Sequence, residues 1–210
     1  MRKRGFVFAV IVVTAFFLSS AAAHGVSNGD TAVFSRAGSY ELGALKPTNS
    51  ALKVKVGDRA PDFTLPAVAS GGEVSLSQYL GKKNVVLSFV PAAWTPICSE
   101  QWPGYNAVKD IFDQHDSVLL GMTVDNVPTL FMWIRHLCEG DTSFWFPVLS
   151  DFMPHGEVAD MYGVLRPEGF SERAIFVIDK KGIIRYIEVY DINKVPPLDT
   201  LVRELQKLER

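Results

Sequence analysis

The stretch Asn84-Val-Val-Leu-Ser-Phe-Val90, followed directly by Pro91-Ala-Ala-Trp-Thr95-Pro-Ile-Cys98, decides the fold of this 210-residue chain. The first seven residues are mostly apolar and rich in β-branched valine, which is typical of a buried strand. A helical pattern begins at or just after Cys98, so this cysteine lies where a strand passes into a helix N-terminus. Unpaired backbone N–H groups and the helix dipole there favour a thiolate over a thiol. The sequence therefore predicts a reactive cysteine at a strand–helix junction.

Strand and helix patterns alternate along most of the chain. The predicted strands span 84–90, 117–124, 173–179 and 183–190, and the predicted helices span 98–114, 128–139, 156–162 and 198–208, with a helical turn at 77–80. The last two strands form a hairpin around Lys180-Lys-Gly182. This order predicts an α/β fold, a thioredoxin-like three-layer α/β/α sandwich with a central mixed β-sheet.

The first 23 residues are typical of a signal peptide. Arg2-Lys3-Arg4 precede an apolar stretch at 6–18, and Ser20-Ala-Ala-Ala23 supplies small residues for cleavage. The apolar stretch is shorter than the roughly 20 residues of a membrane span. We therefore expect export to the periplasm or another extracytoplasmic compartment, with an uncleaved N-terminal membrane anchor as the alternative. Residues 24–53 indicate a flexible spacer, and residues 54–210 form one domain.

Composition and charge exclude some classes of function. The net charge of −2, with no basic tail, argues against nucleic-acid binding. A hydrophobic content of 48% is enough to bury one ordinary core. No metal site is expected, because His136 and Cys138 are two residues apart and point to different sides of a helix.

The spacing of Pro91, Thr95 and Cys98, proline-x-x-x-threonine-x-x-cysteine, resembles the peroxidatic signature of the peroxiredoxins, the alkyl hydroperoxide reductase/thiol-specific antioxidant family. Further segments resemble other blocks of the family in the same order: Val56-Gly-Asp-Arg-Ala-Pro-Asp-Phe63, Phe146-Pro-Val-Leu-Ser-Asp151, Ala159-Asp-Met-Tyr-Gly163 and Arg173-Ala-Ile-Phe-Val-Ile-Asp179. The resemblance implies a thiol-dependent peroxidase that reduces hydrogen peroxide or organic hydroperoxides and needs no cofactor. It also implies an electron donor that is thioredoxin-like or another thiol.

The resemblance also implies roles for four residues. Cys98 attacks one peroxide oxygen and becomes a sulfenic acid. Thr95 orients the thiolate and the incoming peroxide, and Pro91 shields the sulfur from water. Arg173 brings a permanent positive charge to the thiolate. The alternatives are an inert buried cysteine and a surface arginine.

Other ionisable residues are weaker candidates for the site. Arg166 and Arg135 could also supply a positive charge, but the resemblance singles out Arg173. No motif places a histidine beside Cys98, so we expect the four histidines to lie on the surface or to serve in packing.

The second cysteine, Cys138, has two interpretations. One branch of the family places its resolving cysteine on the helix where Cys138 falls, which makes Cys138 a candidate resolving residue. The other interpretation is a small buried apolar side chain. Pro103-Gly104 lies early in the helix that begins near Cys98 and weakens the turn that must open for a disulfide.

Two other functions and one assembly question stay open. Trp94-Thr-Pro-Ile-Cys98 aligns with the thioredoxin motif tryptophan-cysteine-x-x-cysteine, but Thr95 replaces the attacking cysteine of a thiol–disulfide oxidoreductase. A non-catalytic thioredoxin-fold binding protein is the other alternative. The aromatic segment 144–146 and Trp133 indicate either the face of a homodimer or core packing.

Overall fold

The computed structural model describes residues 45–68, 72–140 and 144–208. The chain divides into two units, residues 1–32 and 33–210, and every described residue belongs to the second. The predicted signal peptide and residues 24–44 of the predicted spacer lie outside the described residues. Among the residues that are described, no helix is long and apolar enough to cross a membrane.

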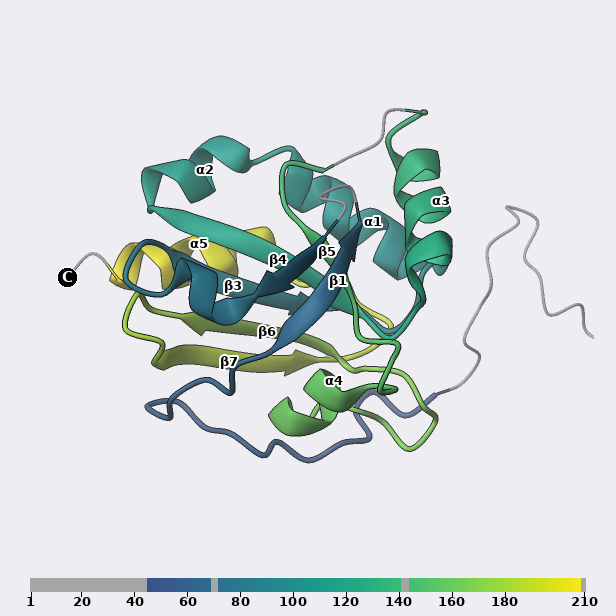
Figure 1. The fold of residues 1–210 in the computed structure, drawn as a ribbon, viewed down its shortest axis with the longest axis horizontal. Coiled ribbons are helices and arrows are strands. Elements are labelled where there is room, and N and C mark those ends of the chain that lie inside the picture. The colour runs from purple at the N-terminus through teal and green to yellow at the C-terminus, as the bar shows by residue number, and fades with distance from the viewer. Residues whose placement is uncertain (1–44, 69–71, 141–143, 209–210) are drawn as a thin grey trace, which may run out of the picture. The chain divides into compact units, whose positions relative to one another are not determined.

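A mixed sheet of seven strands, counted over the described residues, forms the centre of the domain (Figure 1). The strands are β1 (Thr64–Val68), β2 (Glu73–Ser75), β3 (Asn84–Phe89), β4 (Ser117–Thr123), β5 (Val148–Ser150), β6 (Arg173–Ile178) and β7 (Ile184–Tyr190). Their order across the sheet is β2-β1-β5-β4-β3-β6-β7. The pairs β3–β4 and β4–β5 are parallel and the others antiparallel.

Strand β3 lies inside the sheet and contributes side chains to both of its faces. All six of its residues are buried, which explains its nearly continuous apolar sequence. Successive side chains point to opposite faces of a strand. Accordingly, Val85 and Leu87 belong to one apolar cluster and Val86 to the other. Ser88 points to the same face as Val86, which gives that face a buried hydroxyl.

Helices cover both faces of the sheet. One face carries α1 (Pro96–Asn106), α2 (Lys109–Gln114), α3 (Val127–Leu137) and α5 (Leu198–Lys207), whose apolar side chains pack with Val86 and Val177. The other face carries α4 (Glu157–Tyr162) and the 3-10 helix η1 (Leu76–Tyr79), which pack with Val85 and Phe176. The predicted three-layer α/β/α arrangement with a mixed central sheet is confirmed.

The single helix predicted for residues 98–114 is wrong, because the structure has two helices, α1 and α2, in this range. Trp145 contacts the C-terminal end of α1: its backbone N–H donates to Asn106 Oδ1 at 3.1 Å and its indole Nε1 donates to the Tyr105 carbonyl at 3.2 Å. These bonds satisfy polar groups at the C-terminal end of α1, where the helix ends.

The aromatic residues offered as a homodimer face lie in the core. Trp133, Phe144 and Phe146 are buried, and the Trp102 ring lies 5.1 Å from Trp133 and 6.3 Å from Phe146, measured between ring centroids. Burial of this aromatic cluster stabilises the layer of helices that includes α1 and α3. Trp133, Phe144 and Phe146 are therefore core packing and not an interface, while Trp145 is half-buried and packs on Phe112 and Phe146.

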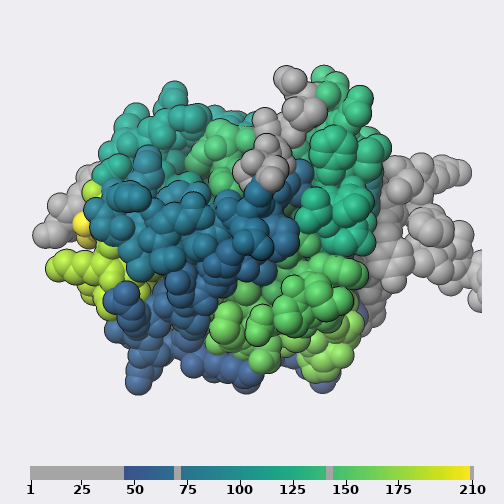
Figure 2. Space-filling view, viewed as in Figure 1, coloured from purple at the N-terminus to yellow at the C-terminus, as the bar shows by residue number. Residues whose placement is uncertain are grey.

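The last residues of the predicted spacer contact the domain. The carbonyl of Pro47 accepts a hydrogen bond from the Ile192 N–H at 3.0 Å, and the Lys53 N–H donates to the Tyr162 carbonyl at 3.4 Å. In Figure 2 this segment, at the start of the blue part of the chain, runs beside the green segment that contains α4. Contacts to the domain thus begin N-terminal to the predicted boundary at residue 54.

Candidate active site

The loop between β3 and α1 carries the predicted reactive cysteine and is anchored by the strand next to it. The Ala93 N–H donates to Asp125 Oδ2 at 2.7 Å, and the same oxygen accepts from the Thr123 hydroxyl at the end of β4 at 2.7 Å. Trp94 has a φ of 66°, in the left-handed region that few residues with a side chain adopt. The anchored loop thus holds a sparsely populated backbone conformation directly before the helix.

Helix α1 begins two residues earlier than predicted. Thr95 is its N-cap residue, and Pro96 occupies the first helical position, where a missing N–H costs nothing. Cys98 therefore lies within the first turn of α1 and not ahead of it. Its side chain is fully buried.

Arg173 lies against Cys98. It is the first residue of β6, and the pairing of Phe89 with Ala174 brings it to the end of β3 from which the loop starts. Its Nη2 donates a hydrogen bond to Cys98 Sγ at 3.4 Å. A charged donor at this distance favours the thiolate form of a cysteine. The structure thus brings together the predicted nucleophile and the predicted arginine.

Every nitrogen of the Arg173 guanidinium has an acceptor. Nη1 donates to Gln101 Oε1 at 2.5 Å, while Nε and Nη2 donate to the Ile192 carbonyl at 3.3 and 3.0 Å. Five donors in a fixed plane make the orientation of a guanidinium sensitive to such partners. Its acceptors among the described residues are two carbonyl oxygens and the sulfur, so none of them is a carboxylate.

A buried polar network supports Gln101, which the sequence analysis missed. Gln101 Nε2 donates to Ser88 Oγ at 3.1 Å and to the Tyr105 hydroxyl at 3.4 Å. Trp102 Nε1 donates to the same serine at 3.2 Å. Burial raises the pKa of Tyr105, so its hydroxyl stays protonated at neutral pH. A signal was available, because residue 101 follows Cys98 by three positions and faces the same side of the helix.

Thr95 and Pro91 are both buried in the loop before Cys98. The Thr95 hydroxyl donates to the Ala92 carbonyl at 3.0 Å. Because that bond uses the hydroxyl proton, the oxygen keeps lone pairs that can accept a hydrogen bond from an incoming ligand.

Residues 56–187 match the model of the AhpC/TSA family. The chain belongs to this family. It is 39% identical over 137 residues to alkyl hydroperoxide reductase E of Mycobacterium tuberculosis, covering 65% of this chain and 86% of that protein. It is 32% identical over 162 residues to the chloroplastic 2-cysteine peroxiredoxin of Chattonella marina var. antiqua, covering 75% and 82% of the two chains.

Solved structures of peroxiredoxins share the fold. The reduced 2-Cys peroxiredoxin of Plasmodium vivax superposes with a TM-score of 0.69 at 30% identity, over 74% of this chain and 82% of that one. Mycobacterium tuberculosis AhpC superposes with a TM-score of 0.67 at 24% identity, over 74% and 93%. The family, the thioredoxin-like α/β fold and the thiol-dependent peroxidase function expected from the sequence are therefore confirmed.

In this AhpC/TSA protein, the second cysteine lies on a helix that packs against the Cys98 helix. Cys138 is the half-buried C-cap residue of α3 and packs against the apolar cluster that contains Cys98. Trp133 of α3 donates from its indole Nε1 to Ser99 Oγ at 3.2 Å. Neither cysteine is in a disulfide here. The resolving and packing interpretations of Cys138 both remain predictions.

In the described residues, the other candidate side chains, Arg166, Arg135 and the histidines, make no hydrogen bond to the Cys98 sulfur. Arg166 is buried, but its Nη1 donates to Glu172 at 2.7 Å and its Nη2 donates to Glu168 at 3.1 Å. Arg135 is exposed near the end of α3. The exposed His136 ring packs on Trp94, with 5.2 Å between ring centroids, in agreement with a packing role.

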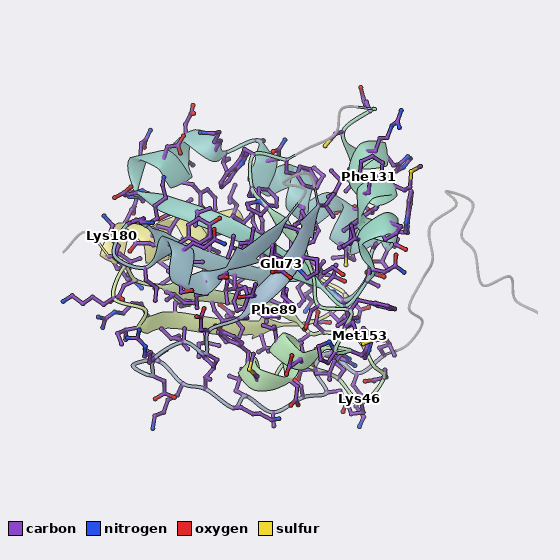
Figure 3. All side chains as sticks on the ribbon, in the orientation of Figure 1. Lys46, Glu73, Phe89, Phe131, Met153 and Lys180 are labelled. Atoms are coloured by element: carbon purple, nitrogen blue, oxygen red, sulfur yellow. The ribbon has the colours of Figure 1, made fainter. Side chains whose placement is uncertain are left out.

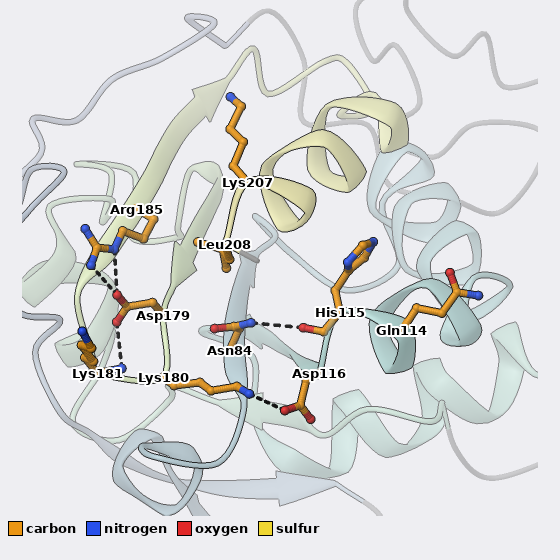
Figure 4. Close-up of a pocket in the computed structure, with 10 residues that line it drawn as sticks. All are labelled: Asn84, Gln114, His115, Asp116, Asp179, Lys180, Lys181, Arg185, Lys207 and Leu208. Carbon is orange, nitrogen blue, oxygen red and sulfur yellow. Dashed lines mark hydrogen bonds and ion pairs between the residues drawn. The ribbon is translucent and has the colours of Figure 1, made fainter. Parts of the chain in front are cut away.

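A surface pocket lies at the other end of the strands from the Cys98 loop (Figure 4). Its lining includes Asn84 at the start of β3, where Lys180 pairs with Asp116 and Arg185 with Asp179. A strand rises about 3.3 Å per residue, so Asn84 and the loop that begins at residue 91 are about 23 Å apart. Figure 3 shows Lys180 on the side of the domain away from Phe131 and Met153. This pocket is thus separate from the Cys98 site.

Acidic, histidine and cysteine side chains do not gather into a metal site in the described part of the chain, where no group of three or more could hold an ion.

Proposed function

We propose that this peroxidase reduces hydroperoxides with Cys98 as the nucleophile and with Arg173 and Thr95 stabilising the reaction. The observation that carries this proposal is the 3.4 Å contact between Arg173 Nη2 and the buried Cys98 Sγ. The names of the relatives, alkyl hydroperoxide reductase and 2-cysteine peroxiredoxin, support hydroperoxides as the substrate class.

The proposed reaction begins with attack of the Cys98 thiolate on one oxygen of the hydroperoxide. A sulfur–oxygen bond forms, the oxygen–oxygen bond breaks, and its electron pair leaves with the second oxygen, which takes up a proton. The sulfur is oxidised to a sulfenic acid, and the peroxide is reduced to water or an alcohol.

Arg173 and the first-turn amides of α1 stabilise this transfer. Negative charge moves from the sulfur toward the leaving oxygen, and a guanidinium already oriented beside the sulfur stabilises that charge without further reorganisation. The Thr95 oxygen accepts a hydrogen bond from the peroxide O–H, and Pro91 limits the access of water to the sulfur.

A thiol completes the proposed cycle. It attacks the sulfenic sulfur, water leaves, and the resulting disulfide is reduced by a further thiol. We propose a thioredoxin-like donor for this last step. Support for Cys138 as the resolving thiol comes from its place on α3, which is hydrogen-bonded to the Cys98 helix through Trp133 and Ser99.

We also propose that the protein is exported and forms a homodimer. Residues 1–23 support export, and the N-terminus of exported material, read by intact mass, would begin near His24 if the segment is cleaved. Large exposed apolar side chains at Phe131, Met132, Phe152 and Met153 support a dimer. Sedimentation velocity of the reduced protein tests it, and a monomer at all concentrations would contradict it.

The test of the central proposal is the mass of the reduced protein after one equivalent of peroxide. We expect Cys98 to gain one oxygen or the chain to lose two hydrogens, and Cys98→Ser to remain unmodified and to consume no peroxide. Cys138→Ser is the control and should still be oxidised at Cys98. Peroxide consumption near the wild-type rate by Cys98→Ser would instead favour another nucleophile, and no consumption by the wild type would favour a binding protein.

A further inference from the structure

We propose that residues 46–49, the N-terminal strap, are positioning residues that hold the Arg173 guanidinium against Cys98. The inference rests on the proposed roles of Cys98 and Arg173. The strap lies outside residues 56–187, which match the family model.

The first link is the backbone of Ile192, which follows β7 and also lies outside the matched range. Its carbonyl accepts two of the hydrogen bonds of Arg173, from Nε and Nη2. Nη2 is also the atom that donates to Cys98 Sγ. A displacement of the Ile192 backbone therefore moves the donor that faces the sulfur.

The second link joins Ile192 to the strap. The Ile192 N–H donates to the Pro47 carbonyl at 3.0 Å. Ile192 thus accepts hydrogen bonds from Arg173 through its carbonyl and donates one to the strap through its N–H. Ile192 is itself buried. If the bond to Pro47 were lost, water could not easily take its place, and the loss would cost stability.

A third link reaches the strand on which Arg173 lies. Glu172, the residue before Arg173, is fully buried, and its Oε1 accepts from the Asn49 N–H at 2.5 Å. Its Oε2 accepts from Arg166 Nη1 at 2.7 Å, and Arg166 Nη2 donates to the Lys46 carbonyl at 3.1 Å. Removing one partner from a buried charged group is costly, so these contacts hold the strap firmly.

The strap therefore holds Arg173 from two directions, through Ile192 and through Glu172. All three of these links use backbone groups of the strap, so they depend on its path. Within the described residues, the one side-chain hydrogen bond of the strap is exposed and runs from Asn49 Nδ2 to Glu168 Oε1 at 3.1 Å. A misplacement of about 1 Å can cost an enzyme up to about 100-fold in rate. Loosening the strap should thus slow oxidation of Cys98 although no strap residue touches the sulfur.

The test compares Asn49→Pro with Asn49→Ala in the full chain. Both variants lose the side-chain bond from Asn49 Nδ2 to Glu168 Oε1, but proline also removes the N–H that donates to Glu172, whereas alanine keeps it. We measure the second-order rate constant for oxidation of Cys98 by hydrogen peroxide and the pH dependence of its alkylation by iodoacetamide. Asn49→Pro should react about tenfold more slowly and show an alkylation profile displaced to higher pH, while Asn49→Ala stays within about twofold of wild type.

A merely structural role would lower the urea midpoint of Asn49→Pro and leave the alkylation profile of the folded protein unchanged, which would overturn the proposal. Equal losses in Asn49→Pro and Asn49→Ala would overturn it as well. If Asn49→Pro does not fold, Pro47→Gly keeps every donor and acceptor but frees the backbone, and it should change both readouts in the same direction by a smaller factor. If Pro47→Gly matched the wild type in both readouts, that result would contradict the positioning role of the strap.

The same measurements separate this inference from the proposed function. If wild-type Cys98 is not oxidised by peroxide, the proposed function itself fails. If wild-type Cys98 is oxidised rapidly and the folded strap variants match it, only the positioning role fails.

Discussion

The sulfur of Cys98 and the guanidinium of Arg173 form a pair in which one fixed charge faces one nucleophile. The acceptors of Arg173 in the described residues are two carbonyls and the sulfur, so no carboxylate among them competes with the sulfur for its charge. A positive charge in a buried site interacts strongly with its neighbour because little water screens it. Most of the electrostatic activation of Cys98 by a side chain should therefore depend on Arg173.

Arg173→Met should slow the oxidation of Cys98 by peroxide about 100-fold. Methionine fills a similar volume but lacks the charged donor that contacts the sulfur. Arg135→Met, which removes an exposed arginine on α3, is the matched control and should leave this rate unchanged. An Arg173→Met variant with the wild-type rate would mean that Arg173 has no part in the reaction.

Sequence reasoning found the side chains of the site that belong to a linear motif and missed those that depend on register. Cys98 and Arg173 could be predicted and do meet in the structure. Ser88 could not, because only the orientation of β3 toward α1 shows that its hydroxyl serves Gln101. Ile192 could not either, because it acts through a backbone carbonyl that has no signature in the sequence.

At the scale of elements, the strongly patterned segments could be predicted and the short ones could not. β3, β4, β6 and β7 begin and end within one residue of the predicted bounds, since each is a long apolar or alternating run. β1, β2 and β5 were not predicted. β2 and β5 have only three residues each, and Pro66 interrupts the pattern of β1, so tertiary pairing decides all three.

Helix α4 depends on a buried carboxylate whose ionisation affects stability. Asp151 accepts hydrogen bonds from the N–H groups of Val158 at 3.1 Å and Ala159 at 2.8 Å, in the first turn of this six-residue helix. Burial raises the pKa of Asp151 to about 6, from 3.8. The folded state therefore binds the proton more tightly than the unfolded state, and the stabilising contribution of the protonated form is complete below pH 3.8 and is lost as the pH rises through about 6.

The contribution of Asp151 to the free energy of unfolding should therefore be about 1 kcal/mol smaller at pH 7.5 than at pH 5. The measurement is urea unfolding of the wild type and of Asp151→Asn at both values, because the difference between the two proteins cancels the titration of other groups. If the free energy of unfolding of the wild type instead rises with pH relative to that of Asp151→Asn, the hydrogen bonds to the carboxylate outweigh its burial.

At the scale of the whole molecule, the two cysteines decide whether this chain completes its cycle alone. They lie on α1 and α3, whose contact includes the Trp133–Ser99 hydrogen bond and one shared apolar cluster. A disulfide forms only when the two Cα atoms come within about 7 Å. Because Cys98 is fully buried in the first turn of α1, we expect it to leave that place before it bonds to Cys138.

The structure of α1 favours such an opening. Pro103 lies inside the helix and cannot donate a hydrogen bond to the Ser99 carbonyl, and Gly104 follows it, so the first turns have weaker helical support. We therefore expect one equivalent of peroxide to convert the reduced chain into a Cys98–Cys138 disulfide, with loss of two hydrogens and a linked peptide in a non-reducing map. Pro103→Ala restores the missing donor and should slow formation of the disulfide without slowing the first oxidation of Cys98. A lasting sulfenic or sulfinic Cys98 beside an unmodified Cys138 would instead show a one-cysteine enzyme that depends on an external thiol.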